Sequence, residues 1–289
     1  MDSSPRWTRA LLMAKATDRL LAENIGDARR NVEWILCELL KCNRASLYAH
    51  PESLVDHTLA DQFWRMLDRR LLHEPLQYIV GYTEFCGLRF DVSPDVLIPR
   101  PETELLVEHA TKILKTIGKP AVLDIGSGSG CIPVSIKHFN PHALVCSCDV
   151  SDAALAMASS NAGRLNKAVT FFQCNILDET IPLNTTLKFD LIVSNPPYIP
   201  TEEYRQLDKE VLNFEPGLAL DSGEDPLQFY RAISTVAINR LHEKGALLFE
   251  THCDFAHDVA SLLTSKGFHY ATVLQDLTNR DRFVLAKKG

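Results

Sequence analysis

The first 80 residues place apolar side chains at helical spacing and contain no run that is typical of a strand. In residues 6–22 the apolar positions that fall close to one helical face are Leu11, Leu12, Ala16, Leu20 and Leu21. Similar patterns predict helices at residues 6–22, 28–40, 46–48 and 59–73. We expect a small all-α bundle whose apolar stripes form a core rather than a binding groove.

A different pattern begins after this bundle. Residues 82–92 alternate and carry aromatic side chains, which predicts a β-hairpin that turns at Cys86 and Gly87. Pro99 and Pro101 then fix an extended approach to a helix expected over residues 102–117. Arg100 lies between these prolines, so the segment either presents Arg100 to a ligand or a facing domain, or is a plain linker before a helix.

From residue 120 onward the chain repeats a unit of strand, loop and helix. The expected strands are residues 121–125, 143–148, 169–173, 189–194, 246–250, 268–275 and 282–286, and the expected helices are 131–139, 153–165, 226–241 and 255–265. This alternation predicts an α/β fold with a mostly parallel sheet, helices on both faces and an antiparallel strand at the C-terminus. We therefore divide the chain into a helical domain (1–80), a β-hairpin linker (81–105) and an α/β domain (106–289).

Composition and charge limit the possible functions. The chain has 289 residues, 46% of them hydrophobic, and no apolar run long enough for a membrane span. Its formal net charge is −7, and residues 1–80 contain 11 basic and 11 acidic residues, so the rest of the chain carries all of that charge. Such a balance argues against binding to nucleic acid, which needs a basic surface. Eight cysteines without metal-ligand spacing, and an N-terminus without a secretory signal, lead us to expect a cytoplasmic protein without a metal.

A glycine-rich loop follows the strand at residues 121–125. Its residues are Gly126, Ser127, Gly128, Ser129 and Gly130, and the next strand ends in Asp149, which can accept hydrogen bonds from ribose hydroxyls. A dinucleotide fingerprint would place a glycine at the sixth position, where this chain has Cys131. Asp124, just before the loop, suits an ammonium group, so a nucleoside that carries an amino acid fits better, and S-adenosylmethionine is such a ligand. The alternative is that the glycines serve only a tight turn.

The segment Asn195, Pro196, Pro197 and Tyr198 directly follows the apolar run at residues 189–194. The two prolines end the strand and stiffen the backbone at the edge where open α/β sheets bind ligands. The side-chain oxygen of Asn195 and the carbonyl of Pro196 can together accept from a planar NH2 group and direct its nitrogen at an electrophile. The alternative is an ordinary Asn-Pro turn in which Tyr198 caps the core.

These motifs together resemble the release factor glutamine methyltransferases, the HemK/PrmC family. The glycine loop, Asp149 and the Asn-Pro-Pro-Tyr segment are typical of class I methyltransferases that act on a planar nitrogen. Further similarity lies in Glu74-Pro75-Leu76-Gln77-Tyr78-Ile79-Val80-Gly81, Ile98-Pro99-Arg100-Pro101-Glu102-Thr103-Glu104, Phe214-Glu215-Pro216 and Asp281-Arg282. The segment with Arg100 between two prolines is the most specific of these.

The resemblance implies a Rossmann-like class I methyltransferase fold with S-adenosylmethionine as the cofactor. It implies cofactor contacts at Gly126, Ser127, Gly128, Ser129, Gly130, Asp149, Asn175, Ile176 and Asn195, where Asn175 and Ile176 are the positions near the adenine. It implies that the substrate amide is held by Asn195, Pro196, Pro197 and Tyr198, of which Asn195, Pro196 and Tyr198 are catalytic.

The reaction that the resemblance implies is methyl transfer to the side-chain amide nitrogen of the glutamine in the Gly-Gly-Gln motif of class I peptide chain release factors. This reaction supports translation termination, and the helical domain would recognise the substrate. Two rival functions stay open: methylation of adenine or guanine in nucleic acid on the same segment, and a non-catalytic nucleotide-binding or assembly role. Glu250 is as consistent with a structural carboxylate as with a functional one, and we expect His242, His252 and His257 at the surface or in loops.

Overall fold

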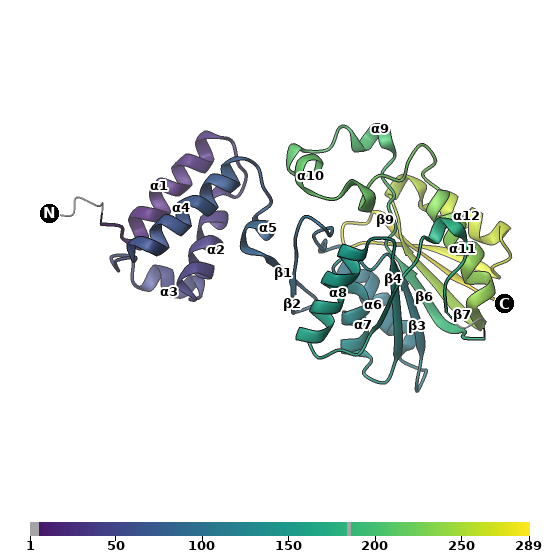
Figure 1. The fold of residues 1–289 in the computed structure, drawn as a ribbon. Helices are drawn as coiled ribbons and strands as arrows, with labels where there is room; N and C mark the ends of the chain where they lie inside the picture. Colours follow the sequence, from purple (N-terminus) through teal and green to yellow (C-terminus); the bar gives the residue numbers. More distant parts are fainter. Residues whose placement is uncertain (1–5, 184–185) are drawn as a thin grey trace. The chain divides into compact units, whose positions relative to one another are not determined.

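The computed structural model describes residues 6–183 and 186–289, which form two compact units (Figure 1). The first unit, called the helical unit below, comprises the chain up to Gly81 together with Asp208–Phe214. The second, called the sheet unit, comprises Tyr82–Leu207 and Glu215–Gly289. The segment Asp208–Phe214 therefore belongs to the helical unit, although it is remote in sequence from the rest of it.

The helical unit has an all-α core, as the apolar spacing predicts. Its helices are α1 (Arg9–Ala22), α2 (Ala28–Leu40), α3 (Arg44–Ala49), α4 (His57–Leu71), the short α5 (Leu76–Val80) and α10 (Lys209–Phe214). Fully buried side chains from the first four helices form one core: Leu12, Leu20, Val32, Ile35, Leu36, Leu47, Phe63 and Leu67. The side chains of Thr8, Asn43 and Asp56 cap α1, α3 and α4 by accepting from backbone N–H groups.

A buried arginine ties the distant segment into the helical unit. The Arg70 guanidinium donates to Asn31 Oδ1, to the Glu74 carbonyl and to Glu210 Oε2, each at 2.8 Å. Arg70 is 7% exposed, so its charge needs these partners to offset the cost of removing it from water. The ion pair with Glu210 thus fixes α10 to α4 and α2.

The sheet unit contains a seven-stranded sheet in the order β5-β4-β3-β6-β7-β9-β8. Its strands are β3 (Ala121–Ile125), β4 (Leu144–Asp149), β5 (Thr170–Gln173), β6 (Phe189–Ser194), β7 (Leu241–Glu250), β8 (Tyr270–Gln275) and β9 (Asp281–Lys287). The first five pair in parallel, and β9 is antiparallel to both of its neighbours. The predicted fold class, including the antiparallel C-terminal strand, is confirmed.

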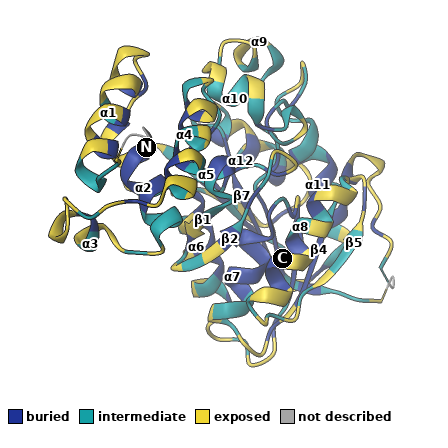
Figure 2. Ribbon diagram, turned by 60° about the vertical axis from the view of Figure 1, so that its left-hand side comes forward, coloured by how far each residue is buried: buried dark blue, intermediate teal, exposed yellow. Residues whose placement is uncertain are grey.

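Successive side chains of the central strands point to opposite faces of the sheet and pack into two hydrophobic cores, one on each face. Leu191 and Val193 of β6 pack with α6 (Thr103–Leu114) and α7 (Cys131–Phe139), whereas Ile192 packs with α11 (Gln228–Arg240) and α12 (Ala256–Ser265). The helix α8 (Asp152–Arg164) lies beside β4 and β5. The central strands are therefore buried on both faces, as their dark blue colour in Figure 2 shows.

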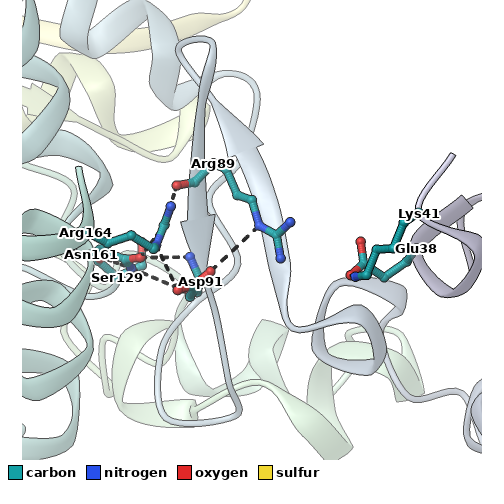
Figure 3. A network of polar contacts seen from close by, with 7 residues as sticks. All are labelled: Glu38, Lys41, Arg89, Asp91, Ser129, Asn161 and Arg164. Carbon is teal, nitrogen blue, oxygen red and sulfur yellow. Dashed lines mark hydrogen bonds and ion pairs between the residues drawn. The ribbon is translucent and has the colours of Figure 1, made fainter. Parts of the chain in front are cut away.

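The predicted hairpin is present as β1 (Tyr82–Phe85) and β2 (Leu88–Asp91). Cys86 and Gly87 turn it with φ values of 51° and 71°, the left-handed pair that a two-residue hairpin loop requires. Asn161 of α8, fully buried, holds the hairpin: its Nδ2 donates to the Asp91 carbonyl at 2.9 Å and its Oδ1 accepts from the Asp91 N–H at 2.8 Å (Figure 3). Nδ2 also donates to the Ser129 carbonyl at 2.9 Å, so one side chain joins the hairpin to the glycine loop.

Several elements differ from the expected ones in their bounds, and some were not expected. The strand β7 begins at Leu241 instead of residue 246, because Leu241 pairs with Phe189 across an irregularity in the register. The helix α6 ends at Leu114 instead of residue 117. The short helices α5, α9 (Thr201–Tyr204) and α10 were not predicted, since runs of four to six residues are too short to show helical periodicity. Among the described residues, no helix has the length and apolar character that crossing a membrane requires.

Candidate active site

A cavity of about 430 Å³ opens at the carboxyl ends of the parallel strands of the sheet unit. Its walls come from the loops after β3, β4, β5 and β6 and from the segment that precedes α6. The predicted site residues that line it are Gly126, Ser127, Gly128, Ser129, Asp149, Asn175, Ile176, Asn195, Pro196 and Pro197. Gly130 and Tyr198 are not among the lining residues, so any contribution they make reaches the cavity through their neighbours. The volume is within the range of small-molecule sites.

The glycine loop is held against β4 by its own backbone. The N–H groups of Gly126 and Ser127 both donate to the Cys148 carbonyl, at 2.8 and 2.9 Å. Gly126, Gly128 and Gly130 have φ values of +91°, +51° and +82°, which side chains with a Cβ rarely adopt. A Cβ at Gly130 would lie 3.1 Å from both Cα and Cβ of Ala158, so α8 also needs a glycine there.

Asp149 supports this loop as well as facing the cavity. Its Oδ2 accepts from the Gly128 N–H at 2.9 Å, and its Oδ1 accepts from the Ser151 N–H at 3.0 Å. A carboxylate has about four acceptor positions, so both oxygens keep capacity for a ligand's hydroxyl groups. The two backbone bonds fix the orientation in which that capacity is presented.

Asp124 lies beneath the loop and not on the cavity wall. It is fully buried, its Oδ2 accepts from the Ser147 hydroxyl at 2.6 Å, and its Oδ1 has no partner among the described residues. Burial, and to a smaller extent the nearby Asp149, raise the pKa of Asp124 to about 8. Ser147 is also 2.6 Å from the Ser127 hydroxyl, so Asp124 reaches the loop through two serines. Asp124 therefore does not face the cavity itself, and any effect on a ligand passes through Ser147 and Ser127.

At the far end of the cavity, Asn175 and Ile176 begin a single turn of 3-10 helix, Ile176–Asp178. The Asn175 side chain caps this turn, since its Oδ1 accepts from the Leu177 N–H at 3.2 Å and its Nδ2 donates to Asp178. Ile176 is buried and supplies an apolar wall. A flat apolar ligand group could therefore pack against Ile176 on one side, and the amide of Asn175 would lie at the edge of that group.

The Asn-Pro-Pro-Tyr segment adjoins the glycine loop. The Ser194 hydroxyl at the end of β6 donates to the Ile125 carbonyl at 2.6 Å, and a Cβ at Gly126 would lie 3.9 Å from the Asn195 carbonyl oxygen. The Asn195 side chain donates through Nδ2 to Thr103 Oγ1 at 3.3 Å. In the part of the chain that the structure describes, no hydrogen bond reaches Asn195 Oδ1, so this acceptor is available to a ligand.

Behind this segment lies a cluster of titratable side chains. Glu250, at the end of β7, is 1% exposed, and burial raises its pKa to about 7 against the opposing effects of the Thr103 hydroxyl, Arg282 and the Tyr198 hydroxyl. Burial also raises the pKa of Tyr198, so its hydroxyl stays protonated. The tyrosine ring lies 6.2 Å from the ring of His252, which pairs with Glu203 at 3.3 Å. The cluster keeps the aromatic ring of the segment in place.

The structure shows the positions of several residues whose roles the sequence did not decide. Arg100 lines the cavity and also pairs at 2.6 Å with Glu215, whose side chain is 2% exposed. Thr103 was not predicted as a site residue, and the only signal for it was its position in the segment that begins with Pro99. His242 and His257 are exposed and His252 lies half buried in a loop beside Tyr198, so all three match the expected surface or loop positions. Within residues 6–183 and 186–289, one trio of possible metal ligands comes together, His252, Cys253 and Asp254, and the expectation of no metal stays a prediction.

Comparison with known proteins identifies both parts of the chain. The family model of the PrmC N-terminal domain matches residues 12–81, and that of the methyltransferase small domain matches residues 101–213. A release factor glutamine methyltransferase of Geobacter sulfurreducens is 40% identical over 283 residues, which cover 98% of this chain and 95% of that protein. The enzyme of the same description from Chlorobaculum tepidum is 37% identical over 290 residues and covers 98% of each chain.

Solved structures agree with this fold at low sequence identity. The hMettl16 catalytic domain superposes with a TM-score of 0.55 at 17% identity, over 82% of this chain and 83% of that one. A methyltransferase of Pyrococcus furiosus gives a TM-score of 0.51 at 16% identity, over 80% of this chain and 99% of that one. At such low identities the structural similarity establishes the fold and does not identify the substrate.

Proposed function

We propose that this chain, which belongs to the release factor glutamine methyltransferase family, methylates the glutamine side chain in the Gly-Gly-Gln motif of class I peptide chain release factors. The donor is S-adenosylmethionine, and the transfer gives the N-methylated amide, S-adenosylhomocysteine and a proton that leaves to solvent. The observation that carries the proposal is Asn195 Oδ1, which accepts no hydrogen bond from the described residues and lies on the rigid segment beside the glycine loop. An acceptor in this position suits the NH2 group of an amide.

The loop residues bind the cofactor in this proposal. S-adenosylmethionine supplies a methyl group on a positively charged sulfur, which is already a strong electrophile. Asp149 accepts from the ribose hydroxyls with the lone pairs that Gly128 and Ser151 leave free. Ile176 packs against the adenine, and Asn175 lies at its edge. Asp124, through Ser147 and Ser127, holds the loop below the cationic part of the ligand.

The Asn-Pro-Pro-Tyr residues hold and polarise the substrate amide. An amide nitrogen is a weak nucleophile because its lone pair is delocalised into the carbonyl. Acceptance by Asn195 Oδ1 and the Pro196 carbonyl favours the state in which positive charge grows on that nitrogen, which is where a fixed electrostatic contact contributes most. Tyr198, kept protonated by burial, does not line the cavity and supports the segment from behind, next to His252. Positioning, rather than a general base, is the main contribution of these side chains.

We propose further that the helical domain, residues 1–80, recognises the release factor and takes no part in the chemistry. Its sequence match to the PrmC N-terminal domain supports a separate role for this part of the chain. A release factor as substrate also favours a cytoplasmic location, since translation termination takes place there.

Methylation with tritium-labelled S-adenosylmethionine tests the proposal. The assay compares a purified class I release factor, the same factor with alanine in place of the Gly-Gly-Gln glutamine, duplex DNA and ribosomal RNA. We expect label only in the unchanged release factor, on glutamine. Label in DNA or RNA, or equal label in the alanine-substituted factor, would reject the assignment in favour of base methylation or another acceptor residue.

A further inference from the structure

We propose that a groove along α6 of the sheet unit binds a segment of the methylated protein that carries apolar and basic side chains and lies close to the target glutamine. The inference rests on the proposed function, because it states where the protein substrate is held outside the cavity of the active site. The groove shares no lining residue with that cavity.

The groove follows one side of a helix, and its volume is about 680 Å³. The lining residues that α6 supplies recur largely at a spacing of three or four positions, which places them on one helical face: Glu104, Leu105, Glu108, Thr111 and Lys112. The other walls are the hairpin turn at Cys86, Phe139 at the end of α7 and the turn between β8 and β9. A helix of 12 residues is about 18 Å long, which is the length of about five residues of extended chain.

Two large apolar side chains in the walls are exposed to water. Leu277, in the turn between β8 and β9, is 86% exposed, and Phe139 is 48% exposed. The turn that carries Leu277 is fixed, because the Asp276 carboxylate accepts from the N–H groups of Thr278 and Arg280 at 2.8 and 3.1 Å. Leu277 is therefore held at the surface by a built turn, and apolar side chains of a partner that cover it stabilise the complex.

Charge determines the kind of partner that fits the groove. Four of its lining residues are acidic and one is basic: Glu102, Glu104, Glu108, Asp276 and Lys112. Lys112 offsets Glu108 at 2.6 Å, and Arg282 offsets Asp276 at 3.7 Å. Glu102 and Glu104 are exposed and make no ion pair within the part of the chain that the structure describes, so the end of the groove near Pro101 is negative. A basic side chain of a partner complements this end, whereas the phosphates of a nucleic acid are repelled by it.

The groove and the cavity of the active site are lined by the same short segment. Pro99, Arg100 and Thr103 line the cavity, and Pro101 and Glu102 between them line the groove. A protein whose glutamine side chain enters the cavity therefore brings its neighbouring residues to the negative end of the groove. A single amide side chain makes few contacts, so a protein substrate needs a wider surface of this kind for its affinity.

The first test removes charge from the groove of the full-length protein. Glu102→Gln and Glu108→Gln are combined in one variant, which keeps the volume of both side chains. The matched control combines Asp258→Asn in α12 with Glu243→Gln in β7, because these acids are also exposed and lie on other elements. Each variant loses one acid that is ion-paired with a lysine and one to which the described residues supply no ion pair.

We expect the groove variant to raise KM for a purified class I release factor about three- to tenfold at low salt, the range that loss of two exposed charge contacts gives. Its kcat and its dissociation constant for S-adenosylmethionine should change less than about twofold, since neither glutamate lines the cavity. The increase in KM should shrink in about 0.5 M salt, which screens such contacts. The control variant should keep the wild-type KM. An equal KM in both variants, or a loss confined to kcat, would overturn the docking role.

Crosslinking tests the apolar wall without any methylation. The photoreactive amino acid p-benzoylphenylalanine replaces Leu277 in one variant and Leu144 in a control. Leu144 is also an exposed leucine, but it lies at the first residue of β4, away from the groove. On irradiation with the release factor, the probe at position 277 should crosslink to a segment that contains lysine or arginine next to the Gly-Gly-Gln motif, and the probe at position 144 should not. A crosslink from position 277 to a second copy of this chain, in place of the release factor, contradicts the proposal.

The two assays separate this inference from the proposed function. If the release factor is methylated while position 277 gives no crosslink to it, the groove is not the docking site and the proposed function stands. If the crosslink forms and no methyl label is transferred, the release factor is a partner and the proposed reaction fails. If neither occurs, both are wrong.

Discussion

Alanine substitutions at three glycines of the sheet unit can distinguish two reasons for a glycine: a positive φ, and the lack of space for a Cβ beside a neighbouring helix. Gly128 and Gly130 both have positive φ, but only Gly130 faces a neighbour, with Ala158 atoms 3.1 Å from the position of an added Cβ. An added Cβ at Gly128 would meet nothing within 4 Å, and Gly128 lines the cavity. Gly163, in α8, has neither a positive φ nor a neighbour within 4 Å.

The magnitudes follow from these environments. A non-glycine residue in the left-handed region costs about 1–2 kcal/mol, so Gly128→Ala should lower the free energy of unfolding by that amount. Gly130→Ala carries the same strain plus a contact with the backbone of α8, and overpacking of this kind adds about 1–3 kcal/mol. Gly163→Ala should stabilise by up to about 1 kcal/mol, the helix preference of alanine over glycine.

Cofactor binding should rank the loop variants in the opposite order. The new methyl group of Gly128→Ala enters the cavity, whereas that of Gly130→Ala enters the interface with α8. We therefore expect urea unfolding to show the larger loss for Gly130→Ala and calorimetry with S-adenosylmethionine to show the larger loss for Gly128→Ala. Gly163→Ala should bind the cofactor as wild type does. If the two loop variants rank in the same order in both measurements, the division of roles within the loop is wrong.

Three further predictions concern polar side chains of the sheet unit. Asp124→Asn should reduce the pH dependence of unfolding in the absence of cofactor. The pKa of Asp124 is raised to about 8, so the stability that its protonated form provides is lost as the pH rises through that value. Thermal unfolding at pH 5.5 and 8.5 measures the difference. Asn195→Ala should lower turnover about 10²–10³-fold with near-normal cofactor affinity, and a wild-type rate would exclude the amide contact. Asn161→Ala leaves the Asp91 and Ser129 backbone groups without their partner and should cost about 2–4 kcal/mol in urea unfolding; a loss below 1 kcal/mol would mean that water replaces the side chain.

The sequence was sufficient to predict those elements whose signal lies in a short, continuous run of residues. Apolar runs predicted the parallel strands, because a strand covered on both faces needs apolar residues throughout. The pair Cys86 and Gly87 predicted the hairpin turn, since glycine supplies a positive φ at no steric cost, and Cys86 accepts a φ of 51° beside it. The glycine loop and the Asn-Pro-Pro-Tyr segment were found because their residues are contiguous and each follows a strand.

What the sequence could not provide depends on contacts between distant residues. Thr103 and Asn195 are 92 positions apart, and Arg70 and Glu210 are 140 apart, so neither pair leaves a periodic signal. The inclusion of α10 in the helical unit follows from such a contact and not from the composition of the segment. Asp124 shows the same limit: its position before the loop suggested a ligand for a cation, whereas β3 directs the side chain to Ser147 beneath the loop.

The glycine loop and the Asn-Pro-Pro-Tyr segment are connected through neighbouring strands, and this connection bears on how the proposed site would position its reactants. The loop is bonded to β4 through the Cys148 carbonyl, and the segment is bonded to β3 through the Ser194 hydroxyl, so both are held by adjacent strands of one sheet. The separation between a bound methyl donor and Asn195 is then a property of the sheet backbone, and side-chain motion contributes little to it. In the proposed reaction the two strands hold the methyl donor and the amide in a fixed geometry, which is the larger contribution when the electrophile is already activated. Substitutions on the segment should therefore appear in the rate of methyl transfer, and substitutions in the loop in the affinity for the cofactor.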